Sequence, residues 1–209
     1  MSLIYIGFSG KAQHGKDTTA GFFKNIIEDY GFKAVVLPFA KELKNMSKEI
    51  YGFTDEELYQ TKPPHVRTAL QKLGTDIIRA RFPDFWVKAL EKLAEREHKK
   101  EYLHTFILVP DVRFENEADF IERNGFVFRL ARAKKTFTKK TALTIETGAK
   151  KHSSETALDD YKSFYATIKN NGTLEDLKDK ATKEIVSLLQ TIKQSSNAFP
   201  VDGPETFPF

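Results

Sequence analysis

The residues best suited to chemistry lie near the amino terminus, in a glycine-containing segment that follows an apolar run. Gly10, Gly15 and Lys16 stand in the spacing G-x-x-x-x-G-K, and a helix-compatible pattern follows them. Glycine lets the backbone turn and approach a polyphosphate closely, so that N–H groups and the positive end of the helix face the anion. Lys16 adds a mobile charge for the outer phosphates. We therefore predict a strand, a phosphate-binding loop and a helix, because an ordinary glycine turn does not account for the flanking pattern and the Gly-Lys pair.

The loop departs from the strict motif at Asp17, where Ser or Thr is usual, and a hydroxyl follows one position later on Thr18. A carboxylate among phosphates is repelled unless a divalent cation lies between them. Asp17 is therefore predicted to lie next to Mg2+, directly or through water. The alternative is that Asp17 only stabilises the first turn of the helix by opposing its dipole.

Length and composition favour one domain in a reducing compartment. The chain of 209 residues can form one well-buried core and is marginal for two. It has no cysteine, which excludes disulfides, thiol catalysis and cysteine-based zinc sites. Neither a signal-like segment nor an apolar run of membrane-spanning length is present, so we expect a cytoplasmic protein without a membrane partner. The net charge of +4 suits anionic small molecules.

Apolar runs alternate with helical patterns along the chain. The runs predict buried strands at residues 3–8, 33–39, 105–110, 126–131 and 163–169. Helical spacing predicts helices at residues 16–30, 41–51, 66–81, 84–101, 115–123 and 173–189, with short ones near 54–57 and 156–161. The stretch between the second and third strands is too long for a plain crossover and indicates a helical insertion at about 41–104. We expect a three-layer α/β domain over 1–193 with a mostly parallel five-stranded sheet, and a tail at 194–209.

Polar residues follow several of the predicted strands. Ligands of parallel sheets bind at the carboxyl ends of the strands, where Asp111, Arg113, Arg132 and Asn170 are expected together with the glycine loop. Phosphoryl transfer depends on neutralising charge, so arginines, a lysine and a metal are the expected parts. The sequence therefore predicts one active site at this edge of the sheet.

Two of these residues have competing interpretations. Asp111 suits a carboxylate that binds a metal through water or orients an acceptor phosphate, but it could instead cap the following helix. Arg113 suits a clamp on an acceptor phosphate through its guanidinium fork, but it could instead pair with Glu117 at helical spacing.

A basic segment follows the fourth predicted strand. Seven basic residues lie between Arg132 and Lys151, against one acidic residue, Glu146. Such a run is commonly a solvated loop. In a protein that handles nucleotides it also suits a lid, which we expect at about 132–155.

Six segments in order resemble the bacteriophage-type deoxynucleoside monophosphate kinases: GKDTTA, FAKELKN, LGTDIIRARFPDFWV, DVRFENEADFI, HSSE and IKNNGTLEDL. The resemblance spans about residues 3–189. It implies a P-loop NTPase fold of the nucleoside monophosphate kinase type, with ATP as phosphoryl donor, Mg2+ as cofactor and a deoxynucleoside 5'-monophosphate as acceptor. A protein encoded by a phage would act in the host cytoplasm. The sequence leaves a homodimer open.

The resemblance also implies site residues. It assigns to ATP the residues Gly10, Gln13, His14, Gly15, Lys16, Asp17, Thr18, Thr19, Arg132, Asn170 and Gly172. It assigns to the monophosphate Lys44, Arg67, Gln71, Thr75, Arg79 and Arg113. The catalytic set is Lys16, Asp17, Asp111, Arg113, Arg132 and Glu155, with Asp17 as metal ligand and Asp111 as a metal neighbour through water.

Several assignments keep an alternative. A solvated helix face accounts equally well for Arg67 and Arg79. His14 could contribute only its backbone, and His152 suits a structural or lid-orienting role better than catalysis, because this reaction needs no histidine base. The role of Glu155 is open.

Other functions are compatible with parts of the sequence. The phosphate loop reads only ATP, so another small-molecule kinase of the phosphomevalonate or dephospho-coenzyme A kinase type is an alternative. An ATP-regulated binding module is a weaker one, because a switch needs no second phosphate clamp. Nucleic acid is not an expected partner, since the aromatic residues lie in core-like runs and are not interleaved with basic residues.

Overall fold

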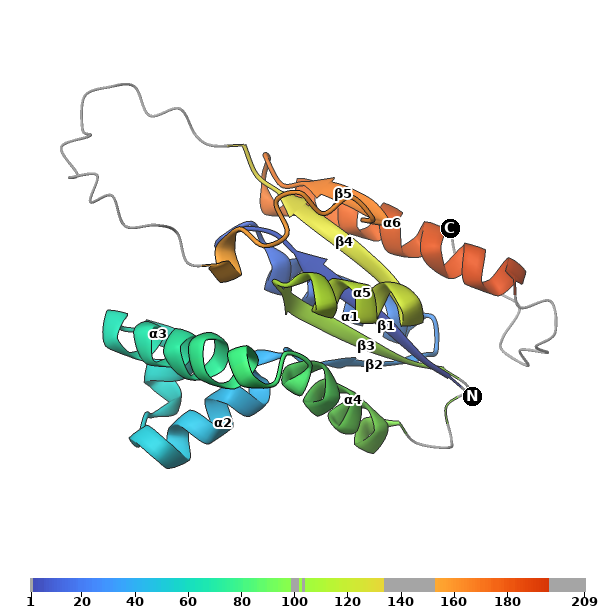
Figure 1. Cartoon of the computed structure of the whole chain (residues 1–209). Helices are drawn as coiled ribbons and strands as arrows, with labels where there is room; N and C mark the ends of the chain where they lie inside the picture. The colour runs from blue at the N-terminus through green and yellow to red at the C-terminus, as the bar shows by residue number, and fades with distance from the viewer. Residues whose placement is uncertain (1, 99–101, 103, 134–152, 196–209) are drawn as a thin grey trace, which may run out of the picture.

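A computed structural model describes residues 2–98, 102, 104–133 and 153–195. Its sheet contains β1 (Ser2–Ser9), β2 (Lys33–Val36), β3 (His104–Val112), β4 (Gly125–Ala131) and β5 (Ala166–Lys169). The strand order is β2-β3-β1-β4-β5, and every neighbouring pair is parallel (Figure 1). The predicted five-stranded parallel sheet is therefore confirmed.

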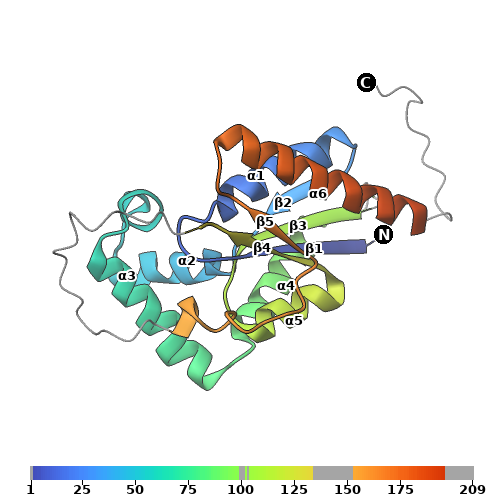
Figure 2. The same cartoon turned by 90° about the horizontal axis from the view of Figure 1, so that it is seen from above.

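Helices cover both faces of the sheet, as Figure 2 shows. On one face lie α1 (Lys16–Asp29) and α6 (Leu174–Ser195), and on the other lie α4 (Phe85–Glu97) and α5 (Glu115–Asn124). β1 and β3 are buried on both sides, which explains why they appear in the sequence as continuous apolar runs. The result is the three-layer α/β arrangement expected from the sequence.

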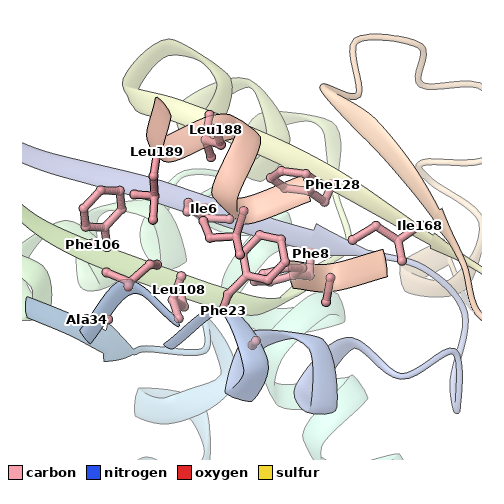
Figure 3. Close-up of a cluster of buried hydrophobic side chains, with 14 of the residues drawn as sticks. Ile6, Phe8, Phe23, Ala34, Phe106, Leu108, Phe128, Ile168, Leu188 and Leu189 are labelled. Carbon is pink, nitrogen blue, oxygen red and sulfur yellow. The ribbon is translucent and has the colours of Figure 1, made fainter. Parts of the chain in front are cut away.

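The core under α1 and α6 is rich in aromatic rings (Figure 3). Phe8 of β1 meets Phe23 of α1 edge to face at 5.1 Å between centroids, and Phe23 meets Phe128 of β4 at 5.2 Å. All three rings are fully buried. Since α1 begins at the end of the glycine loop, this packing fixes where the loop meets the sheet.

The helical insertion comprises α2 (Ala40–Tyr51), η1 (Glu56–Thr61), α3 (Pro64–Gln71) and η2 (Lys72–Arg79), and η1 and η2 are π-helical. α3 continues directly into η2. The Trp86 indole of α4 donates to the Gly74 carbonyl at 2.9 Å, and a methyl group at Gly74 would lie 2.6 Å from Leu43 of α2. Within the insertion, η2 thus packs against α2, and it also contacts α4. The insertion lies beyond the carboxyl ends of the strands (Figures 1 and 2).

Some predicted boundaries are wrong. β2 and β5 are shorter than expected, and β3 extends to Val112, so that Asp111 lies inside the strand. The helix predicted near 156–161 is absent there; a 3-10 turn, η3 (Ser153–Glu155), precedes these residues. Contacts with distant segments hold this part of the backbone. The Glu155 carbonyl accepts a hydrogen bond from Lys11 at 2.7 Å, and the Leu158 carbonyl accepts one from Arg129 at 3.0 Å.

Most of the predicted lid, residues 134–152 with His152, and the tail from 196 onward lie outside the described residues. The division into one domain with an insertion, a lid and a tail stays a prediction. Within the described ranges, none of the helices is both long and apolar enough to cross a membrane.

Candidate active site at the carboxyl ends of the strands

The loop between β1 and α1 requires glycine at the two glycine positions of the motif, Gly10 and Gly15. Gly10 has φ 148°, and an added methyl group would lie 2.4 Å from the Leu130 carbonyl oxygen. Gly15 has φ 92°, and the same addition would lie 2.7 Å from Nδ2 of Asn170. Both positive φ values disfavour a side chain, and at Gly10 the contact with backbone also excludes one. The sequence-predicted reason for these glycines, a tight turn, therefore holds in the structure.

Lys16 lies inside this loop and is 8% exposed. Its Nζ donates to the carbonyls of Gly10 at 2.8 Å and Lys11 at 2.9 Å. Burial lowers the pKa of Lys16, and Arg113 lowers it further, whereas Asp17 and Asp111 oppose the shift. The ammonium group is therefore bonded to the loop backbone, and nearby charges of both signs act on it.

The loop is tied to the neighbouring strands on the β4 side. The His14 ring contacts the Leu130 carbonyl through Nδ1 at 3.0 Å, and Asn170 donates from Nδ2 to the His14 carbonyl at 3.1 Å. Arg132 approaches the Gln13 carbonyl at 3.5 Å. His14 thus uses its side chain as well as its backbone, and these contacts bring Arg132 and Asn170 to the loop as the sequence predicted.

The polar side chains in the first turn of α1 differ in their exposure to solvent. Thr19 is buried, and its hydroxyl donates to the Gly15 carbonyl at 2.9 Å. Asp17 and Thr18 are exposed. Asp17 is therefore accessible to a solvated ligand, and Thr19 contributes to the loop structure through its own hydrogen bond.

Asp111 caps a helix, but not the helix expected from the sequence. Its two carboxylate oxygens accept the N–H groups of Phe39 at 2.8 Å and Ala40 at 3.0 Å, at the start of α2. The alternative that Asp111 caps α5 is wrong, because Glu117 accepts the N–H groups that precede α5. Burial raises the pKa of Asp111, against the opposing effect of these two hydrogen bonds and of Arg113 and Lys44.

Lys44 of α2 belongs to the same electrostatic region. Its Nζ lies 4.0 Å from the centroid of the Tyr59 ring. Burial and the nearby Lys62 lower the pKa of Lys44, whereas Asp111 and Asp17 raise it. The same two carboxylates therefore act electrostatically on Lys16 in α1 and on Lys44 in the insertion.

A pocket of about 150 Å³ lies between the loop, the ends of β3 and β4, and residues 154–159. Four cationic side chains line it: Lys11, Arg113, Arg129 and Arg132. Arg113 is exposed, and its guanidinium lies 3.4 Å from the Ser154 carbonyl. The expected alternative for Arg113, an ion pair with Glu117, is wrong among the described contacts, since Glu117 pairs with Arg79.

Sequence reasoning missed three residues of this pocket. Lys11 pairs with Asp159, and Arg129 lies 3.9 Å from the same carboxylate. Arg129 interrupts the apolar run of β4, and a charge in a buried strand was the available signal. Lys11 and Asp159 carry no such signal in the sequence, because they are far apart along the chain and each resembles an ordinary surface charge.

The remaining predicted residues lie around this centre. Glu155 meets Lys11 through its backbone carbonyl, and its side chain is exposed. At Gly172 an added methyl group would lie 2.2 Å from Asp176, which accepts the N–H of Thr173 at 2.7 Å in the cap of α6. Gly172 therefore allows the turn next to Asn170.

The residues assigned to the monophosphate follow one another along α3 and η2. Arg67 is exposed, and Gln71 and Thr75 are half-buried. Arg79 is 13% exposed in its side chain and pairs with Glu117. Its guanidinium therefore faces α5, so that a direct contact with the acceptor has less support for Arg79 than for Arg67, Gln71 and Thr75.

The oxygen donors suit a hard divalent cation. Among the described residues, no group of three or more His, Cys, Asp or Glu side chains could enclose a metal. Asp17 is exposed beside the loop, and Asp111 has its orientation fixed by two N–H groups. A hard divalent cation is commonly held by one or two carboxylates together with substrate phosphates, and these two aspartates are ligands of that chemical type.

Comparisons with known proteins point to one family. A family model described as deoxynucleotide monophosphate kinase matches residues 33–181. A protein of Acanthamoeba polyphaga mimivirus, provisionally named deoxynucleotide monophosphate kinase, is 29% identical over 194 residues, covering 83% of this chain and 92% of the relative.

Solved structures with similar folds are more distant in sequence. TT1252 from Thermus thermophilus has a TM-score of 0.48 and 19% identity, covering 90% of this chain and 99% of its own. The dephospho-CoA kinase from Campylobacter jejuni has a TM-score of 0.43 and 15% identity, covering 89% of this chain and 97% of its own.

Proposed function

Because the chain belongs to the deoxynucleotide monophosphate kinase family, we propose how its residues divide between donor, acceptor and metal. The reaction transfers the γ-phosphoryl group of ATP to a deoxynucleoside 5'-monophosphate. An oxygen of the acceptor phosphate forms a bond to the γ-phosphorus, and the bond to the β,γ-bridging oxygen breaks, which yields ADP and the diphosphate. The attacking oxygen is already anionic, so the site needs charge and position more than a general base.

The donor side consists of the glycine loop and its neighbours. Its N–H groups and the positive end of α1 face the β- and γ-phosphates, and Lys16 follows the transferred group with its charge. Arg132 and the basic segment close over ATP, and Asn170 with Gly172 lies near the adenine. Gln13, His14, Thr18 and Thr19 complete the loop. The hydrogen bonds that join this loop to Arg132 and Asn170 support the grouping.

The acceptor side consists of Arg113 and the insertion. Arg113 clamps the monophosphate through its guanidinium fork, with Lys44 as a second cation. Arg67, Gln71 and Thr75 line the nucleoside part of the pocket. The observation that carries this proposal is the shared pocket, since Arg113 lines it together with Gly10 and Lys11 of the donor loop.

The metal side consists of Asp17 and Asp111. Bound Mg2+ would neutralise the donor phosphates, held by Asp17 directly and by Asp111 through water. Glu155 lines the same pocket, and its side chain is exposed. The proposal also includes the cytoplasm as the place of action, with soluble nucleotides as partners.

The test is a coupled assay of ADP release with purified protein, ATP and Mg2+. Acceptors are the four deoxynucleoside monophosphates, their ribose counterparts, phosphomevalonate and dephospho-coenzyme A. We expect turnover with at least one deoxynucleoside monophosphate. Turnover only with phosphomevalonate or dephospho-coenzyme A would contradict the acceptor assignment, and ADP release that no acceptor stimulates would contradict the kinase reaction.

A further inference from the structure

The turn that presents Arg113 is held by a buried carboxylate. Glu117 of α5 is 3% exposed, and its Oε2 accepts the N–H groups of Arg113 at 2.8 Å and Phe114 at 3.1 Å. These are the two residues between β3 and α5. The backbone of the acceptor clamp is therefore fixed by this one side chain.

The insertion holds the same carboxylate from the other side. Arg79, the last residue of η2, pairs with Oε1 of Glu117 and places its guanidinium carbon 3.9 Å from the centroid of the Phe114 ring. Arg79 also donates to Oδ1 of Asn116 at 3.0 Å. Asn116 in turn donates to the Pro83 carbonyl at 3.0 Å, just beyond η2. Two side chains thus fasten the Arg113 turn to the insertion.

Among the described residues, Nε of Arg79 is a buried donor without a hydrogen-bond partner in the protein, so the pair is not a fully satisfied network. A buried ion pair is also weak evidence for stability, because desolvation offsets the attraction. In addition, π-helical turns such as η2 occur frequently at functional sites.

We propose that Glu117 is a positioning residue through which the insertion, by way of Arg79, sets the place of Arg113 for the acceptor phosphate. This inference rests on the proposed function, in which the insertion lines the nucleoside pocket and Arg113 clamps the phosphate. When the nucleoside of the acceptor binds against α3 and η2, Arg113 is then aligned with the phosphate of the same acceptor molecule. Neither residue touches the reacting atoms.

The charge on Glu117 gives the proposal a pH signature. The charged groups that face this carboxyl are Arg79 from η2 and Asp111 from β3, together with the N–H groups of Arg113 and Phe114. Burial raises the pKa of Glu117 to about 7, and Arg79 and the two N–H groups only partly oppose it. Below this pH the carboxyl takes up a proton and loses its ionic hold on Arg79. The KM for the acceptor should therefore rise as the pH falls through 7.

The experiment measures KM for ATP and for the deoxynucleoside monophosphate between pH 5.5 and 8.5 in wild type, Glu117→Gln, Arg79→Met and the double variant. At pH 8, Glu117→Gln should raise the acceptor KM about tenfold and leave the KM for ATP within about twofold, as expected for a displaced positioning contact. The phosphate of the acceptor also titrates near pH 6, but this affects the wild type and the variants equally, because the acceptor is the same in every assay. The ratio of acceptor KM values between variant and wild type should therefore shrink below pH 7.

Two controls separate positioning from loss of structure. Lys48 and Asp55 form an exposed pair at 2.9 Å in the same insertion, and Lys48→Met should leave both KM values unchanged. The double variant Arg79→Met with Glu117→Gln contains no unpaired buried charge, so it remains measurable if a single variant fails to fold. Because Arg79 and Glu117 act in one network, the acceptor KM of the double variant should not exceed that of the single variant with the higher acceptor KM.

Specific outcomes overturn the inference. Folded variants, single or double, with a lowered melting temperature and unchanged acceptor KM would show a merely structural pair, as would a KM ratio that is independent of pH. Equal rises in the KM for ATP and acceptor would also contradict positioning of Arg113. If wild type phosphorylates no deoxynucleoside monophosphate, the proposed function fails together with this inference; unchanged KM values in variants of an active protein overturn the inference alone.

Discussion

Truncation of Arg113 is the sharpest test of the acceptor side. Its guanidinium is exposed and lies 3.4 Å from the Ser154 carbonyl, which is too long for a strong hydrogen bond. Arg113→Ala should therefore change the free energy of unfolding by less than about 0.5 kcal/mol. The lost charge-assisted bond to phosphate is worth roughly 1.5 to 3 kcal/mol, or about ten- to a hundredfold in the acceptor KM.

The KM for ATP should respond much less. Arg113 lowers the pKa of Lys16, so its removal leaves Lys16 more firmly protonated and its hold on ATP intact. Steady-state kinetics with each substrate varied would measure both constants. Arg123→Ala is the matched control, because Arg123 lies near the other end of α5 and its Nε donates to the Asp119 carbonyl of the same helix at 3.1 Å. A rise in the KM for ATP alone, or an equal effect in the control, would refute the assignment of Arg113.

Three further predictions concern the donor, the metal and stability. Lys16→Ala should abolish ADP release while circular dichroism stays native, because the bonds of Lys16 to described residues go to loop carbonyls. Asp17→Asn should shift the Mg2+ concentration for half-maximal rate upward; an unchanged titration would leave Asp17 only its effect on the helix dipole. Glu117 has its pKa raised from 4.5 to about 7 by burial, so the folded protein binds this proton more tightly than the unfolded chain. Urea titrations should therefore show a free energy of unfolding that falls as the pH rises from about 4.5 to about 7, and a weaker fall in Glu117→Gln.

The parts of the molecule that depend on local sequence could be predicted. The turn at Gly10 and Gly15 requires residues without side chains, and the buried strands require uninterrupted apolar runs, so both are visible in the chain itself. The cap of η1, in which Thr54 and Glu57 exchange hydrogen bonds, is likewise a matter of neighbours.

Interactions between distant segments could not be predicted. Asp111 resembled a cap for the helix that follows it, but its partners Phe39 and Ala40 precede it by a whole insertion. The pairing of Arg79 with Glu117 also joins two segments that the topology brings together. Single-sequence periodicity carries no information on such contacts. The assignment of Arg79 to the nucleotide pocket was open for the same reason.

The central claim is that this chain transfers the γ-phosphoryl group of ATP to a deoxynucleoside monophosphate. The most direct measurement incubates the protein with Mg2+, ATP labelled in the γ-phosphate and each deoxynucleoside monophosphate, and separates the products by chromatography. We expect label in the deoxynucleoside diphosphate, dependent on the monophosphate and absent with Lys16→Ala. Label found only in inorganic phosphate, at a rate that the monophosphates do not change, would contradict it.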